Sequence, residues 1–321
     1  MDRDPILLTP GPLTTTLRTK KAMLKDWGSW DIDFNKITKR IRSQLLSIIH
    51  GHDDYVVVPM QGSGTFAVEA SINSILPPNG HLLVLNNGAY CQRMATLTTK
   101  MGRKATLLSF NEREPVSPEA LKKALINDAS ITHVGLIHCE TGAGVLNPVN
   151  EISDICKEFN VGLIVDAMSS FGALPISTRD IQFDALISAS GKCLESVPGM
   201  GFIFIRKAIL EGMQGNSQSL SLDLYDQYQY MEKTGQWRFT PPTHIVAALA
   251  EALDQFEEEG GQSERLARYT NNCQTLVSGL SKIGLEPFLD EDNITPIIVT
   301  FLAPKYDQYN FKSFYDAVKN E

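Results

Sequence analysis

Three segments that lie far apart in the chain carry residue types that can bind an anion, a cation and a carbonyl group. The first is Gln61-Gly62-Ser63-Gly64-Thr65, between an apolar run and a helix-like segment. Small residues let the backbone approach an anion, and the N-terminus of a helix presents unpaired N–H groups. The pattern predicts a phosphate cradle at Ser63, Gly64 and Thr65. A plain strand-to-helix turn is the alternative.

The same segment, extended to Ala67, matches the relaxed dinucleotide fingerprint G-x-G-x-x-A. A dinucleotide-binding enzyme also needs an acidic residue at the end of the next strand, where it holds the ribose. No Asp or Glu occurs between Glu69 and Glu112. The dinucleotide interpretation therefore fails, and a single phosphate remains.

The second and third segments supply an acid and an amine. Asp166 ends the apolar run from Gly162 to Val165, where a carboxylate can pair with a ligand cation, although a helix N-cap fits equally well. Lys192 stands among small uncharged residues, where burial lowers the pKa of an amine and frees it for Schiff-base chemistry. A solvated surface lysine is its alternative.

Together, the three segments are the parts that pyridoxal phosphate requires: a phosphate cradle, an acid for the pyridine nitrogen and a lysine for the carbonyl carbon. Tyr90 follows Asn87-Gly88-Ala89 at another predicted strand end and could stack on the ring, although a half-buried core tyrosine fits the spacing as well. The pattern thus predicts a pyridoxal phosphate site.

Alternating strands and helices must position these residues. The sequence predicts strands at 56–60, 82–85, 105–109, 133–138, 162–165, 185–188 and 202–205, and helices at 65–76, 91–101, 118–125 and 149–159. This alternation is typical of a largely parallel sheet that is covered on both faces. The short interval before 202–205 leaves little room for a helical crossover, so we expect this strand to be antiparallel.

The pattern changes after Thr240. The stretch 243–280 is helical and interrupted at Gly260-Gly261, and a strand at 296–302 and a helix around 311–318 follow. We expect an N-terminal segment (1–15) near the active site, a large cofactor-binding domain (16–258) and a small C-terminal α/β domain (259–321). The last strand has no evident partner, so we expect the small domain to be incomplete.

Composition excludes several other classes. The formal net charge of −8 and the lack of a basic cluster argue against nucleic-acid binding. Five scattered cysteines without a C-x-x-C pair are typical of reduced thiols, and the N-terminus does not resemble a signal peptide, so we expect a cytoplasmic protein. No stretch is apolar enough to span a bilayer, and we expect no metal site.

The chain resembles the class V aminotransferases of fold-type I. The resemblance is carried by Leu7–Pro12, Gln61–Gly64, Asn87–Tyr90, Ile164–Gly172 and Gly191–Cys193. It implies a homodimer with a shared active site and a mostly parallel seven-stranded sheet. Lys192 would bond the cofactor, Asp166 would bind its ring nitrogen, Tyr90 would stack, and Ser63, Gly64 and Thr65 would hold its phosphate. Further implied contacts are Thr141 at the ring hydroxyl, Thr240 and Trp237 at the phosphate of the partner subunit, and Gly11 and Pro12 at the substrate.

Ser219–Tyr225 and Trp237–Thr240 resemble the branch of this family that moves the amino group of 2-aminoethylphosphonate to pyruvate. Alanine–glyoxylate or serine–pyruvate transamination in the same fold, and a catalytically silent subunit, are the alternatives. A cysteine desulfurase is disfavoured because Cys193 directly follows the candidate lysine.

Two departures from the family pattern stand out. Gly191 occupies a position where relatives often carry an amide side chain. Relatives also continue into a segment with an arginine that binds the substrate's anionic group. Arg93 and Arg238 are the candidates here for that role.

Overall fold

A computed structural model describes residues 4–320, and seven of its strands form one sheet in the order β1-β9-β8-β7-β4-β2-β3. These strands are β1 (Tyr55–Gln61), β2 (His81–Asn86), β3 (Lys104–Ser109), β4 (His133–Ile137), β7 (Gly162–Asp166), β8 (Ala185–Ala189) and β9 (Met200–Arg206). Two short strands, β5 (Cys139–Glu140) and β6 (Val145–Leu146), pair separately. The seven predicted strands of the sheet are confirmed, with boundaries that differ by two residues at most.

Only β9 runs against the other strands of the sheet. It is antiparallel to both β8 and β1, whereas the pairs among β8, β7, β4, β2 and β3 are parallel. The connection between β8 and β9, residues 190–199, is a loop without a helix. A parallel return needs a crossover of about a dozen residues or more. The expected antiparallel strand is therefore confirmed, and the loop that forces it carries Lys192.

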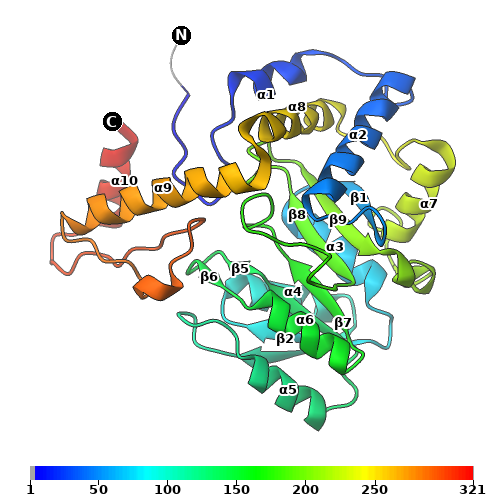
Figure 1. The fold of residues 1–321 in the computed structure, drawn as a ribbon, viewed down its shortest axis with the longest axis horizontal. Coiled ribbons are helices and arrows are strands. Elements are labelled where there is room, and N and C mark those ends of the chain that lie inside the picture. The colour runs from blue at the N-terminus through cyan, green and yellow to red at the C-terminus, as the bar shows by residue number, and fades with distance from the viewer. Residues whose placement is uncertain (1–3, 321) are drawn as a thin grey trace.

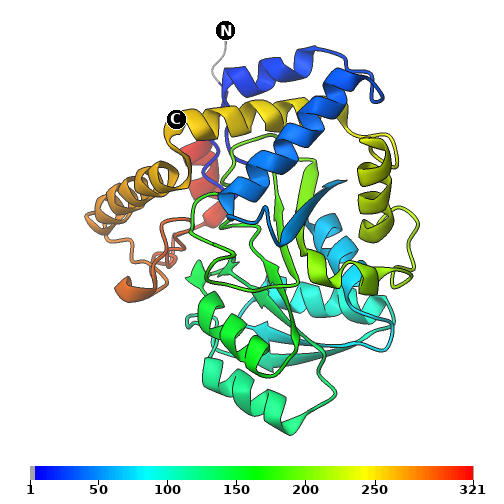
Figure 2. The same ribbon diagram turned by 45° about the vertical axis from the view of Figure 1, so that its right-hand side comes forward.

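Helices cover both faces of the sheet (Figures 1 and 2). They are α1 (Leu17–Lys21), α2 (Ile32–Ile48), α3 (Gly64–Ile75), α4 (Ala89–Lys100), α5 (Pro118–Asn127), α6 (Val149–Glu158), α7 (Leu224–Thr234), α8 (Thr243–Glu259), α9 (Gly261–Ser281) and α10 (Phe311–Asn320). Two apolar clusters result, one with α2, α5, α6 and α8 and the other with α3 and α4. Within β1, Val57 belongs to the first cluster and Val56 and Val58 to the second. Because both faces are buried, the strands read as continuous apolar runs.

The C-terminal part differs from the prediction in one respect. α9 leads away from the sheet and carries the last segments with it (Figure 1). The prediction of a strand at 296–302 is wrong. In the described residues, this stretch forms an isolated antiparallel β-bridge between Phe301 and Pro287 instead of a strand. The segment packs on the β5–β6 hairpin, where the Thr300 hydroxyl donates to the Gly142 carbonyl at 3.1 Å. Within residues 4–320, no helix is both long and apolar enough to cross a membrane.

Candidate active site

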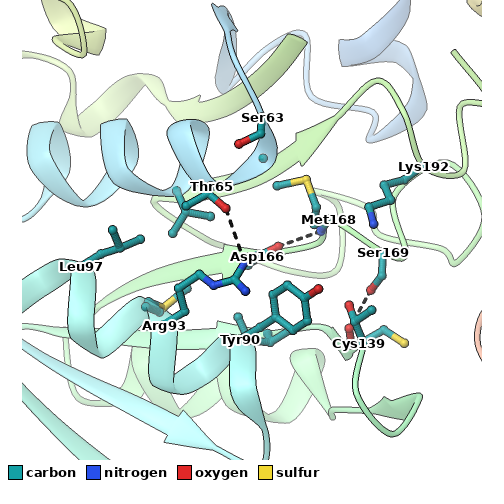
Figure 3. A pocket seen from close by; sticks show the side chains of 15 residues that line it. Ser63, Thr65, Tyr90, Arg93, Leu97, Cys139, Asp166, Met168, Ser169 and Lys192 are labelled. Carbon is teal, nitrogen blue, oxygen red and sulfur yellow. Dashed lines mark hydrogen bonds between the residues drawn. The ribbon is translucent and has the colours of Figure 1, made fainter. Parts of the chain in front are cut away.

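The predicted phosphate cradle lies at the junction of β1 and α3. Ser63 is the N-cap of α3, and its side chain makes no capping hydrogen bond. The first N–H groups of α3 therefore stay available to a ligand, and the helix dipole adds a partial positive charge there. Ser63, Gly64 and Thr65 all line one cavity of about 200 Å³ (Figure 3).

Asp166 enters the same cavity from the carboxyl end of β7. The side chain is buried, and Oδ1 accepts a hydrogen bond from the backbone N–H of Met168 at 2.8 Å. Burial raises the pKa of the Asp166 carboxyl to about 6, against the effect of that hydrogen bond and of the cations Lys192 and Arg93. A cation placed against this carboxyl would restore its ionised form. Asp166 is not an N-cap, because no helix begins between β7 and β8 in the described residues.

Lys192 reaches the cavity from the loop that follows β8. It is half-buried, and its Nζ donates a long hydrogen bond, 3.5 Å, to the carbonyl of Gly11. Burial lowers the pKa of its ammonium group. The structure thus brings Lys192 and Asp166 to one cavity, as Figure 3 shows, although the two residues come from different strands.

Tyr90 and Arg93 line the cavity from the first turns of α4. The Arg93 guanidinium lies 4.6 Å from the centre of the Tyr90 ring, and its Nη1 donates to Thr65 Oγ1 at 3.5 Å. Thr141, which directly follows β5, lines the cavity as well. Of the two candidate arginines, only Arg93 is in the cavity. Arg238 instead pairs with Asp226 at 2.9 Å and does not line it.

Four predicted site residues lie outside the cavity lining. Gly11 packs on Lys192, and a Cβ on Gly11 would lie 2.9 Å from the backbone oxygen of Gly191; its φ of +145° also favours glycine. Pro12 and Thr240 are exposed. Whether they contact a substrate or a partner subunit stays a prediction.

The assignment of Trp237 as a cofactor contact needs correction. Its side chain is only 6% exposed and belongs to the apolar cluster that also contains α2 and α8. Its single polar group, the indole N–H, donates to Thr38 Oγ1 at 3.1 Å. A side chain that is buried and already hydrogen-bonded has nothing left to offer a ligand. Trp237 is a core aromatic residue.

Several lining residues were missed by the sequence analysis. Met168 and Ser169 follow Asp166 in the chain, and both line the cavity. The Ser169 hydroxyl donates to the carbonyl of Cys139 at 2.6 Å and so fixes the two loops against each other. Met168 could have been predicted as a lining residue, because it lies two residues after an acid at the carboxyl end of a strand. The apolar lining is completed by Val68, Met94, Leu97 and Ile137.

Gly191 has a steric reason to be glycine. A Cβ at this position would lie 3.2 Å from the Cα of Pro198, closer than ordinary van der Waals contact. A larger side chain at this position would therefore require Pro198 to shift by a few tenths of an ångström.

The lining fits a flat aromatic ring that carries a phosphate. Hydroxyl and N–H donors gather at the start of α3, a buried carboxyl faces the cavity from β7, an amine faces it from the loop after β8, and the walls are apolar. No group of three or more His, Cys, Asp or Glu side chains within residues 4–320 is arranged to hold a metal ion. The sheet and this cavity at the carboxyl ends of its strands define the fold as that of the fold-type I aminotransferases.

The chain belongs to the aminotransferase class-V family, whose model matches residues 22–319. It is 66% identical to 2-aminoethylphosphonate–pyruvate transaminase 2 of Polaromonas sp. strain JS666 over 99% of this chain and 86% of that protein. It is 58% identical to 2-aminoethylphosphonate–pyruvate transaminase 1 of Cupriavidus pinatubonensis over 99% of this chain and 84% of that protein. The crystal structure of an alanine–glyoxylate aminotransferase from Nostoc sp. matches with a TM-score of 0.91 and 25% identity, over 100% of this chain and 85% of that one.

Proposed function

We propose that the protein is a pyridoxal phosphate-dependent aminotransferase that moves the amino group of 2-aminoethylphosphonate to pyruvate, giving phosphonoacetaldehyde and L-alanine. The observation that carries the proposal is the convergence of Lys192, Asp166 and the Ser63–Thr65 cradle on one cavity. The substrates follow from relatives that are 58% and 66% identical over nearly the whole chain and carry that name.

When bound, pyridoxal phosphate supplies a carbonyl carbon that takes up an amino group and a ring that accepts electrons. Asp166 would accept a hydrogen bond from the protonated ring nitrogen and so keep the ring cationic. Lys192 Nζ would bond the carbonyl carbon and, once displaced by the substrate amine, would carry the proton that leaves the substrate carbon. A lowered pKa suits this role, because a larger fraction of the amine is neutral at pH 7.

The remaining contacts are proposed on the same basis. Ser63, Gly64 and Thr65 would hold the phosphate, Thr141 would contact the ring hydroxyl, and Tyr90 would cover one ring face. Met168 is suited to cover the other. Gly11 and Pro12 would border the substrate, which the contact between Gly11 and Lys192 supports.

We further propose a cytoplasmic homodimer in which a second copy supplies Thr240 to the phosphate. The exposure of Thr240 and of the neighbouring Phe239 supports this arrangement. The division into segments 1–15, 16–258 and 259–321 is supported by the break between α8 and α9 at Gly260.

The test begins with the protein reconstituted with pyridoxal phosphate. The wild type should show an absorbance band near the edge of the visible, which 2-aminoethylphosphonate alone should bleach and pyruvate should restore. Lys192→Ala should abolish the band, whereas Lys233→Ala, which changes an exposed lysine on α7, should keep it. Retention of the band in Lys192→Ala would refute the assignment.

The choice of donor separates the alternatives. Bleaching by alanine or serine but not by 2-aminoethylphosphonate would indicate the alanine–glyoxylate or serine–pyruvate activity instead. A band that no donor bleaches would indicate a subunit that binds the cofactor without turning over.

A further inference from the structure

The loop that carries Lys192 is held from behind by a buried arginine of α9. We propose that Arg265 is a positioning residue for Lys192, because its guanidinium binds the carbonyl of the next residue, Cys193, and fixes the loop on α9. The inference rests on the proposed role of Lys192, and one arm of its test does not require the cofactor.

The loop itself is a tight turn with Lys192 at its tip. The Ser190 hydroxyl donates to the Val197 carbonyl at 2.6 Å, and the Ser196 N–H donates to the Ser190 carbonyl at 3.1 Å. Within this closure, the Glu195 N–H donates to the carbonyl of Lys192 at 2.7 Å. Because these hydrogen bonds close the turn, a displacement of residues 193–197 should also displace the backbone of Lys192.

Glu195 shows that contacts outside the loop hold this turn. Its φ is +55°, a left-handed conformation that costs a non-glycine residue about 1 kcal/mol or more. Its carboxylate accepts hydrogen bonds from Arg268 at 2.9 Å and from the Tyr269 hydroxyl at 2.8 Å, both on α9. The strained residue of the turn is thus bound to the same helix as Arg265.

Arg265 is the most deeply buried part of this connection. Its side chain is 3% exposed, and its Nη2 and Nε lie 2.6 and 2.8 Å from Glu259 Oε2 at the end of α8. Its Nη1 donates to the Cys193 carbonyl and lies 3.9 Å from Glu195 Oε2. A lysine cannot replace these contacts together, because it lacks the planar fork of donors. Loss of the guanidinium would leave the Cys193 carbonyl without this partner.

Arg268 provides a matched comparison within the same network. It pairs with the same two carboxylates, Glu195 and Glu259, but its side chain is 41% exposed. Its hydrogen bonds within the described residues do not include the Cys193 carbonyl. The contacts to the carboxylates and the contact to the Cys193 carbonyl can therefore be changed separately.

The position of Lys192 depends on this backbone support because its side chain has little other anchorage. The single hydrogen bond of Nζ within the described residues is the 3.5 Å contact with Gly11. Misplacing a reacting group by about 1 Å can cost about a hundredfold in rate. A loop released from α9 should therefore slow the reaction without changing how the substrate binds.

The experiment compares Arg265→Lys with Arg268→Lys as holoenzymes. In Arg265→Lys we expect kcat to fall about tenfold or more while KM stays within about threefold. The visible circular dichroism per bound cofactor should change as well, because it reports the orientation of the lysine-linked ring. Arg268→Lys weakens one contact of Glu195 but leaves the Cys193 carbonyl bound to Arg265, so both quantities should change clearly less than in Arg265→Lys. A lower melting temperature in Arg265→Lys with unchanged kcat and dichroism would overturn the proposal, as would an equal loss in both variants.

Two further measurements keep the proposal testable. If Arg265→Lys does not fold, Glu195→Gln loosens the same turn from its other side and should lower kcat and alter the dichroism; no change in either would count against the proposal. In the cofactor-free protein, an amine-reactive label read by mass spectrometry should modify Lys192 at a different rate in Arg265→Lys than in wild type, with Lys233 as the internal reference. Should the wild type fail to form the cofactor band, the proposed function fails, and this labelling alone decides the role of Arg265.

Discussion

The raised pKa of Asp166 predicts a pH dependence of stability that a single substitution should remove. In the cofactor-free protein, burial raises the pKa of this carboxyl from 3.8 to about 6. The folded state therefore holds the proton more tightly than the unfolded state between these values. The stability that this group contributes is present below about pH 4 and is lost as the pH rises through about 6. A shift of about two pKa units corresponds to about 3 kcal/mol.

Asp166→Asn removes the titration and leaves an amide oxygen that can still accept the Met168 N–H. The free energy of unfolding of the variant minus that of the wild type should therefore rise by about 2 kcal/mol between pH 4 and pH 7.5, because part of the unfolded-state carboxyl is already ionised at pH 4. For a chain of this size, that is about 3–4 °C in melting temperature. Denaturant unfolding of the cofactor-free proteins across this range measures the difference.

Asp154→Asn, at an exposed position on α6, is the control and should show a difference that does not vary with pH. If the difference in unfolding free energy between Asp166→Asn and wild type also did not vary with pH, the reasoning would be refuted.

Cofactor binding should favour the ionised form of Asp166 over the protonated form, because a cationic ring attracts the carboxylate. A charge-assisted hydrogen bond contributes about 1.5–3 kcal/mol, so Asp166→Asn should weaken cofactor affinity about tenfold to a hundredfold.

Three further substitutions test individual assignments. Tyr90→Ala should weaken cofactor affinity by about twofold to tenfold through lost stacking, whereas Tyr90→Phe should preserve it, as measured by absorbance titration. Trp237→Phe should lower the free energy of unfolding by about 1–3 kcal/mol, because it removes buried volume and the hydrogen bond to Thr38, and it should leave cofactor affinity unchanged in the same titration. Gly191→Asn should cost about 1–3 kcal/mol in urea denaturation, because its Cβ is forced towards Pro198.

The parallel sheet could be predicted closely from the sequence because both of its faces are buried. Each central strand then appears as an uninterrupted apolar run between polar or glycine-containing turns. The helices α2 and α7 were not predicted. In α2, three buried apolar residues, Phe34, Ile41 and Leu45, are separated by mostly polar and charged ones, so the stripe is sparse. Its helical conformation is stabilised by packing on α8 and β1 rather than by a strong local signal.

Some lining residues could be predicted because they stand at strand ends or helix starts, where the fold itself creates a crevice. Ser63, Asp166 and Lys192 belong to this group. The role of Trp237 could not be decided in this way. Trp237 lies three residues before Thr240 in the chain, and both belong to one motif. A motif alone does not show that two of its residues reach different parts of the structure. Only the packing shows that the indole is in the core while Thr240 is at the surface.

Burial gives Asp166 and Lys192 a common property that neither residue shows in the sequence. It raises the pKa of the acid and lowers the pKa of the amine, so each group is shifted towards its neutral form. The charge of each group opposes the shift of the other, but burial outweighs this interaction for both. The amine that the proposed reaction needs neutral is thus favoured by the same burial that keeps the acid protonated. A cationic ring placed against Asp166 would supply the counter-charge that Lys192 does not, and it would ionise the carboxyl.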